Sequence, residues 1–120
     1  MNDKLITVKE AQDLQTNWNE NQGKGIKSRG LKDVREFLFS LEELQEYIDH
    51  VKTKSAEQGI TKPGIRIYFG AYAGDKENKS TVFLAPTQST ESAESNDKVL
   101  NNYEISPLNT VMGGYPPTNY

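Results

Sequence analysis

The sequence of 120 residues contains no cysteine and only one histidine, His50. The absence of cysteine excludes disulfides, thiolate metal sites, iron–sulfur clusters and thiol nucleophiles, and one histidine cannot build a histidine-rich metal site. Long apolar runs are also missing. The first residues are charged throughout, unlike a signal peptide, and no window approaches the roughly 18 apolar residues of a membrane span. We therefore expect a cytoplasmic protein without cofactors or metals.

The chain also lacks the excess of basic residues that attracts polyanions. Its net charge of -3 and pI near 5.2 argue against nucleic acid or an anionic membrane as a partner. Leu, Ile, Val and Phe together make up about 22% of the residues, just above the roughly 20% below which chains rarely fold. These values predict one small domain with polar flanking segments.

A first helix is predicted near the beginning of the chain. Thr7 and Glu10 have the Ser/Thr-x-x-Glu spacing of a capping box, in which each side chain accepts from the backbone N–H of the other residue. Apolar residues then recur at helical spacing, which predicts a helix over 8–19. Residues 19–30 contain three Gly and a single apolar residue, so we expect a loop or flexible linker there.

A second helix is the clearest element of the sequence. Ser40 and Glu43 repeat the capping-box spacing, and Gly59 is a suitable residue just beyond a helix C-terminus. These signals predict a helix over 41–58, with acidic residues early and basic residues late, as the helix dipole favours. Its inward stripe is expected to be Leu41, Leu44, Ile48 and Val51.

Three strands are predicted around the second helix. Residues 34–39 are rich in aromatic and branched side chains, 65–72 alternate strictly, and 80–85 form a hairpin with them that ends at Pro86. One face of the sheet is expected to carry Phe37, Phe39, Ile65, Ile67, Phe69, Val82 and Leu84. The opposite face is expected to carry Arg66, Tyr68 and Tyr72, with Phe83 beside them.

The order of elements predicts an α+β fold with a small mixed three-stranded sheet. A strand–helix–strand unit closes by a right-handed crossover, so the first two strands would be parallel, with both helices on one face. The expected domain organisation is an N-terminal helix and flexible linker (1–30), an α/β core (31–86), a disordered polar loop (87–98) and a C-terminal tail that docks on the sheet (99–120).

Several sequence blocks resemble a family of small bacterial proteins of unknown function. They are REFLFSLEELQEYI, GIRIYFGAY, STVFLAPT and the tail PLN…GGYPP, and they span about 34–117. The resemblance implies a single compact cytoplasmic domain. It implies no activity, ligand or catalytic residue.

Catalytic motifs are weak throughout the sequence. His50 follows Glu46 by one helical turn, which is common on solvated helix faces, and no Gly-x-Ser-x-Gly motif accompanies it. Residues 23–28 (GKGIKS) lack the spacing of a phosphate-binding loop and no predicted strand precedes them. The acidic residues of the second helix suit its dipole, and the acidic loop 74–79 lacks a calcium-binding pattern. We therefore expect no catalytic residues.

The open face of the sheet is the strongest candidate site. Arg66, Tyr68, Tyr72 and Phe83 are residue types that anchor interfaces, and Arg can bind a carboxylate or phosphate through two hydrogen bonds. Coverage of this face by the protein's own tail is favoured over a partner or an idle face. RNA-binding sheets also display aromatics, but their Gly-rich signature is absent.

The favoured hypothesis is thus a non-catalytic module that binds a protein or a small anionic ligand. One alternative is a small enzyme or sensing domain that holds a carboxylate or phosphate through Arg66 and Tyr68. The other is an inhibitory partner of the immunity-protein type, since an acidic protein suits a basic target. The oligomeric state stays open.

Overall fold

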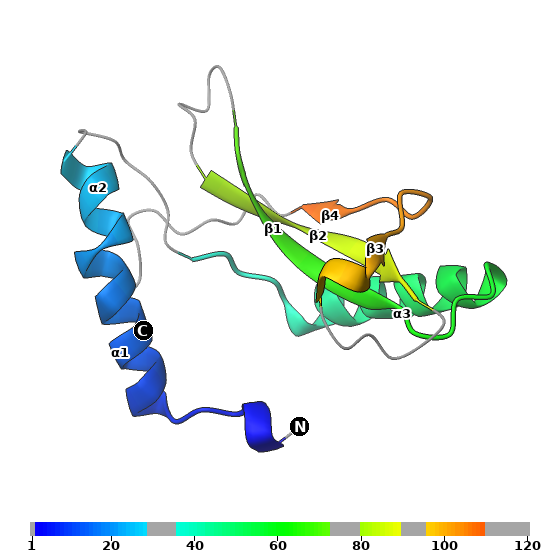
Figure 1. Ribbon diagram of the computed structural model, residues 1–120, viewed down its shortest axis with the longest axis horizontal. Coiled ribbons are helices and arrows are strands. Elements are labelled where there is room, and N and C mark those ends of the chain that lie inside the picture. Colours follow the sequence, from blue (N-terminus) through cyan, green and yellow to red (C-terminus); the bar gives the residue numbers. More distant parts are fainter. Residues whose placement is uncertain (1, 29–35, 73–79, 90–95, 110–120) are drawn as a thin grey trace. The chain divides into compact units, whose positions relative to one another are not determined.

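The computed structural model describes residues 2–28, 36–72, 80–89 and 96–109 (Figure 1). The chain divides into two compact units. One contains the short 3-10 helix η1 (Asn2–Lys4) and helices α1 (Val8–Glu20) and α2 (Gln22–Ser28), and the other contains helix α3 (Leu41–Glu57) and the sheet. The α+β class is therefore confirmed. No helix within the described ranges is both long and apolar enough to cross a membrane.

The first helix begins where its capping box predicts. The hydroxyl of Thr7 accepts from the Glu10 N–H at 3.0 Å, and the Glu10 carboxylate accepts from the Thr7 N–H at 3.1 Å. The expected loop that follows is wrong for residues 22–28, which form α2. Gly23 is buried, and a Cβ there would lie 3.1 Å from the Trp18 ring. Close packing on Trp18 favours a helix that the two Gly of this segment alone would disfavour.

Helix α3 agrees with its predicted ends. The Ser40 hydroxyl accepts from the Glu43 N–H at 3.0 Å, and Gly59 adopts a positive φ of 76°. The Gly59 N–H donates to the Ala56 carbonyl and the Ile60 N–H to the Ser55 carbonyl, which is the Schellman pattern of helix termination.

The buried stripe of α3 differs from the predicted one. Tyr47, Val51 and Ser55 are buried, whereas Leu41 is 86% exposed and Ile48 is 40% exposed. The reason is the Tyr47 hydroxyl, which reaches the Leu84 and Ser106 carbonyl oxygens at 3.3 and 2.8 Å. Because a buried phenol needs such partners, the helix turns Tyr47 inward in place of Ile48.

The sheet has four antiparallel strands: β1 (Gly64–Ala71), β2 (Ser80–Gln88), β3 (Leu100–Asn101) and β4 (Leu108–Asn109). Strand β2 is central. It pairs with β1 on one side and with the short strands β3 and β4 on the other, and α3 lies against the sheet (Figure 1). Of the tail, residues 100–101 and 108–109 pair with β2. They add two short strands to one edge of the sheet, and Asn101 contacts Arg66 and Tyr68 on the predicted open face.

The expected mixed sheet is therefore wrong. Residues 34 and 35 lie outside the described residues, and 36–40 contain only a single bridge residue, Phe37. No parallel pair occurs among the described strands, because the edge of β2 is paired with the tail instead. The second helix predicted to cover the sheet, α1, belongs to the other unit, so its placement there stays a prediction.

Strand β2 continues beyond Pro86, where the hairpin was expected to end. The Pro86 carbonyl accepts from the Asn102 N–H at 2.9 Å, on the side of the tail. In an antiparallel ladder the N–H and C=O of one residue face the same neighbour. The nitrogen of Pro86 therefore also faces the tail, and its missing N–H removes no hydrogen bond to β1.

Between β3 and β4 the tail loops outward. Thr87 is opposite Asn101 and Leu84 is opposite Leu108. Between these two pairs the tail therefore contains four more residues than β2 does. The loop sends Ile105 into the core and leaves Tyr103 90% exposed.

The core is small and lies between α3 and one end of the sheet. Tyr47, Val51, Leu84 and Ile105 form it, with Phe39, Leu44, Ile65 and Leu108 packed around them. The prediction that Ile67 and Phe69 are inward is wrong in part. They share the face of Ile65, but they are 66% and 87% exposed because the core cluster ends at Ile65 on this strand.

The polar segment predicted over 87–98 is more ordered at its ends than expected. Residues 87 and 88 belong to β2, and Asn96–Lys98 form the short 3-10 helix η3. Residues 90–95, and the hairpin loop at 74–79, lie outside the described residues. The division of the chain into an N-terminal region (1–30) and an α/β core (31–86) stays a prediction.

Candidate binding site

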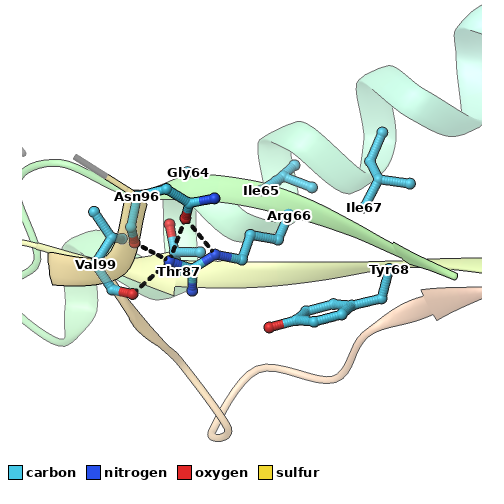
Figure 2. Close-up of a pocket in the computed structure, with 8 residues that line it drawn as sticks. All are labelled: Gly64, Ile65, Arg66, Ile67, Tyr68, Thr87, Asn96 and Val99. Carbon is cyan, nitrogen blue, oxygen red and sulfur yellow. Dashed lines mark hydrogen bonds between the residues drawn. The ribbon is translucent and has the colours of Figure 1, made fainter.

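The four predicted site residues share the sheet face opposite α3, as predicted. Arg66 and Tyr68 alternate with the residues that face the helix, Phe83 lies directly across from Tyr68, and Tyr72 follows the end of β1. Figure 2 shows Ile65 and Ile67 on one side of β1 and Tyr68 on the other. Three regions of this face differ in what their side chains can do.

The first region is the guanidinium of Arg66, which ties the tail to β1. Its Nε and Nη2 donate to Asn96, Nη2 also donates to the Val99 carbonyl, and Nη1 donates to the Asn101 side chain, all at 2.6–2.8 Å. Four of its five N–H groups thus point at neutral acceptors, and Figure 2 shows the hydrogen bonds to Asn96 and Val99. Arg66 holds η3 and β3 in place and has little capacity left for an anion.

The second region is an aromatic pair. The rings of Tyr68 and Phe83 stack with centroids 5.3 Å apart and planes 17° from parallel. The Tyr68 hydroxyl accepts from Asn101 Nδ2 at 2.8 Å. Since the Asn101 oxygen accepts from Arg66, the amide orientation is set and the Tyr68 O–H proton remains able to donate.

The third region is a polar cluster around Tyr72. Its hydroxyl accepts from Asn109 Nδ2 at 2.9 Å and lies 3.3 Å from the Thr81 hydroxyl, and Thr81 lies 3.1 Å from Asn109. These contacts join the end of the hairpin to β4. Tyr72 is therefore a structural residue of the sheet.

A cleft of about 330 Å³ opens beside the aromatic pair. It is lined by Tyr68, Phe83, Tyr103 and Pro107, by the buried residues Pro86 and Ile105, and by the amides of Asn101 and Asn102. The Asn102 amide donates to Gln58 at 2.6 Å and its oxygen accepts from the Glu104 N–H at 3.1 Å. Both amides are thus held in place, and the accessible apolar surface of the cleft comes from its aromatic side chains and Pro107.

A second pocket, of about 590 Å³, follows residues 64–68 of β1 and is bordered by Thr87, Asn96 and Val99 (Figure 2). Because Thr87 belongs to the neighbouring strand β2 and Asn96 and Val99 accept from Arg66, the pocket lies over the open face beside Arg66. Among the described residues that line it, Arg66 is the one with a charged side chain, and its guanidinium is already engaged.

The two weak catalytic motifs of the sequence, His50 and residues 23–28, lie on helices. His50 is exposed on α3, and the neighbouring Asp49 carboxylate accepts from Gln45 at 3.0 Å. Residues 23–28 lie in α2 and not between a strand and a helix. Within the described ranges, no three His, Asp or Glu side chains gather as metal ligands do.

Sequence reasoning missed four residues of this face: Asn96, Asn101, Tyr103 and Asn109. The asparagines contact residues of β1 and the hairpin that lie 28–37 positions away in the sequence. No local spacing indicates such contacts. The tail's apolar residues did indicate that it docks.

Comparison with protein-family models, with curated proteins and with solved structures finds no match. The resemblance of residues 34–117 to a family of small bacterial proteins therefore stays a prediction.

Proposed function

We propose that the protein is a non-catalytic interaction module whose cleft on the open sheet face binds an extended segment of a partner protein. The segment carries an aromatic or proline side chain that enters between Tyr68, Phe83 and Tyr103. The cytoplasm of a bacterium is the proposed location, supported by the charged composition and by the resemblance of the sequence blocks.

The observation that supports this proposal best is the exposed aromatic wall of the cleft. Tyr103 is 90% exposed in a loop whose neighbour Ile105 is 3% exposed, so the loop presents one ring outward while the other side chain anchors it. Tyr residues on such rigid supports contribute large contact areas at little entropic cost, and they are enriched among residues that dominate binding energy.

The polar groups at the cleft fit a peptide backbone. The Tyr68 hydroxyl accepts from Asn101 and can donate its own proton to a carbonyl oxygen. Flat apolar walls beside one donor are what grooves for proline-containing and aromatic segments present. A peptide segment thus satisfies both the apolar and the polar surface of the cleft.

A small anion bound by Arg66 is less favoured. It would have to displace the Asn96, Val99 and Asn101 oxygens, which already accept from four of the five guanidinium N–H groups. Loss of these contacts would release η3 and β3 from β1. The engaged state of Arg66 therefore favours a protein segment over an anion.

Peptide selection followed by titration tests the proposal. A library of random peptides displayed on phage is selected against the wild-type protein, and synthetic copies of the selected peptides are titrated by calorimetry. We expect the selected peptides to share an aromatic or proline residue. Tyr103→Lys should weaken their binding at least tenfold, because it replaces an exposed cleft wall without removing a core residue.

Leu41→Lys is the matched control. Leu41 is 86% exposed on α3, so the variant adds the same charge to an exposed apolar position outside the cleft. Equal affinity for the wild type and both variants would contradict the proposal. Selection of acidic peptides that depend on Arg66 and not on Tyr103 would support the anion-binding alternative instead.

A further inference from the structure

Within the part of the chain that the structure describes, β1 is an outer strand of the sheet, and the backbone groups along its outer edge have no partner there. Among the described strands, β1 pairs only with β2. The Lys62 N–H donates to the Ser89 carbonyl at 2.8 Å, and Pro86 faces the tail, so the even-numbered residues of β1 face β2. The N–H and C=O groups of residues 65, 67, 69 and 71 therefore point outward.

This edge lacks the features that usually prevent strands from pairing. Natural outer strands are protected by proline, lysine or bulges. β1 has eight residues, no proline and a single charged side chain, Arg66. The Arg66 guanidinium is held over the open face by Asn96, Val99 and Asn101, so it does not block the edge.

Two large apolar side chains are exposed along the same edge. Ile67 and Phe69 lie on the α3 side of β1 and are 66% and 87% exposed. A strand added to this edge would satisfy the outward backbone groups and cover both side chains.

We propose that the occupant is a second copy of this chain, whose β1 pairs antiparallel with the first across a two-fold axis perpendicular to the sheet. An antiparallel pair of identical strands is self-complementary, as a two-fold interface requires. In the proposed register Ile67 lies opposite Phe69 of the second copy, and Tyr68 lies opposite Tyr68 of the second copy.

The backbone selects this register. Antiparallel pairing across such an axis brings residues of the same face together, so odd-numbered residues pair with odd-numbered ones. With Ile67 opposite Phe69, residue 65 meets 71, and all four outward residues of each strand have a partner that can donate and accept. The neighbouring register, with Ile67 opposite itself, would place Ala71 opposite Pro63, which has no N–H.

The side chains agree with the same register. Arg66 lies opposite Gly70 of the second copy, so no charge meets a like charge and no bulky side chain opposes it. Ile67 and Phe69 from the two copies form one apolar cluster on the α3 side. A partner of different sequence would need to reproduce this complementarity, whereas a second copy supplies it.

Sedimentation velocity over a range of protein concentrations tests the proposal. We expect the wild type to sediment as a dimer at high concentration and to dissociate on dilution. Ile67→Lys should raise the dissociation constant at least tenfold, because it places charges within the apolar cluster. Leu41→Lys, at an exposed position of α3, should leave it unchanged. A wild type that stays monomeric, or a dimer that Ile67→Lys does not weaken, overturns the proposal.

Cysteine crosslinking tests the register, since the native chain has no cysteine. Facing residues of a non-hydrogen-bonded antiparallel pair have Cα atoms about 4.5 Å apart, which a disulfide can span. Tyr68→Cys should therefore crosslink two copies under mild oxidation. Gly70→Cys should not, because the two positions lie roughly 13 Å apart along the strand. Efficient crosslinking through Gly70→Cys, or none through Tyr68→Cys in a dimeric sample, overturns the proposed register.

Discussion

The hydroxyl of Tyr47 donates a hydrogen bond of 2.8 Å to the carbonyl oxygen of Ser106, 59 residues further along the chain. The same hydroxyl lies 3.3 Å from the Leu84 carbonyl oxygen on the central strand. One side chain of α3 thus contacts β2 and the tail loop that borders the cleft. The position of the cleft therefore depends on the packing of α3 against the sheet.

Removal of the Tyr47 hydroxyl should lower stability measurably. Tyr47→Phe leaves the ring in the core but removes the donor, and we expect a loss of about 1 kcal/mol in the free energy of unfolding. Urea denaturation measures this loss. Leu41→Ala, at an exposed position of the same helix, is the control and should change stability little. A Tyr47→Phe variant as stable as the wild type would mean that the hydroxyl contributes nothing to the docking of the tail.

The Tyr47 hydroxyl should also make the protein less stable at alkaline pH. Burial raises the pKa of the Tyr47 hydroxyl above its ordinary value of 10.0. The unfolded chain therefore releases the Tyr47 proton at a lower pH than the folded protein does. The contribution of the protonated hydroxyl to the free energy of unfolding is full below about pH 10, and it is lost as the pH rises through the folded-state pKa. Thermal unfolding followed between pH 8 and 11 should show a smaller alkaline decrease for Tyr47→Phe than for the wild type. Identical profiles would contradict the assignment to Tyr47.

Arg66 should contribute more to stability than Ile67, although the alternation of β1 alone suggests the reverse. Arg66→Ala removes five hydrogen bonds to the tail, so we expect a loss of at least about 2 kcal/mol, which is the contribution of a single hydrogen bond from a charged donor. Ile67→Ala should lose under about 1 kcal/mol, because its side chain is largely exposed. Chemical denaturation of both variants at a low concentration, where only the monomer is present, decides the order. A greater loss from Ile67→Ala would place Ile67 in the core.

The N-terminal cap of α3 can be tested independently. Ser40→Ala removes the acceptor for the Glu43 N–H and should cost about 1 kcal/mol, within a range of roughly 0.5–2. Ser40→Asp should retain most of the stability, because a carboxylate also accepts at this position. An unchanged denaturation midpoint for Ser40→Ala would show that another group caps the helix.

Local signals in the sequence predicted α1, α3 and the hairpin well. The caps at Thr7 and Ser40 and the termination at Gly59 depend on residues three or four positions apart, which a sequence shows directly. The alternation in 65–72 likewise placed Arg66 and Tyr68 on one face. The α2 helix was missed because it depends on close packing between Gly23 and Trp18.

The sheet order and the cleft could not be predicted in the same way. Strands β3 and β4 have two residues each, too short for a periodic pattern, and β2 passes through a proline. The cleft forms because the tail loops out between these two strands. Its walls come from β1, β2 and the loop around Tyr103, segments whose proximity depends on long-range pairing.

Mapping of chemical shifts by NMR tests the proposed binding site most directly. The 15N-labelled protein is titrated with N-acetyltyrosinamide and, in a separate series, with inorganic phosphate. We predict that N-acetyltyrosinamide shifts the signals of Tyr68, Phe83, Asn101 and Tyr103 most strongly, and that phosphate leaves the Arg66 Nε signal unchanged. Shifts confined to α3 or to the outer edge of β1, or a phosphate-dependent shift of Arg66 without a response to N-acetyltyrosinamide, would contradict the account.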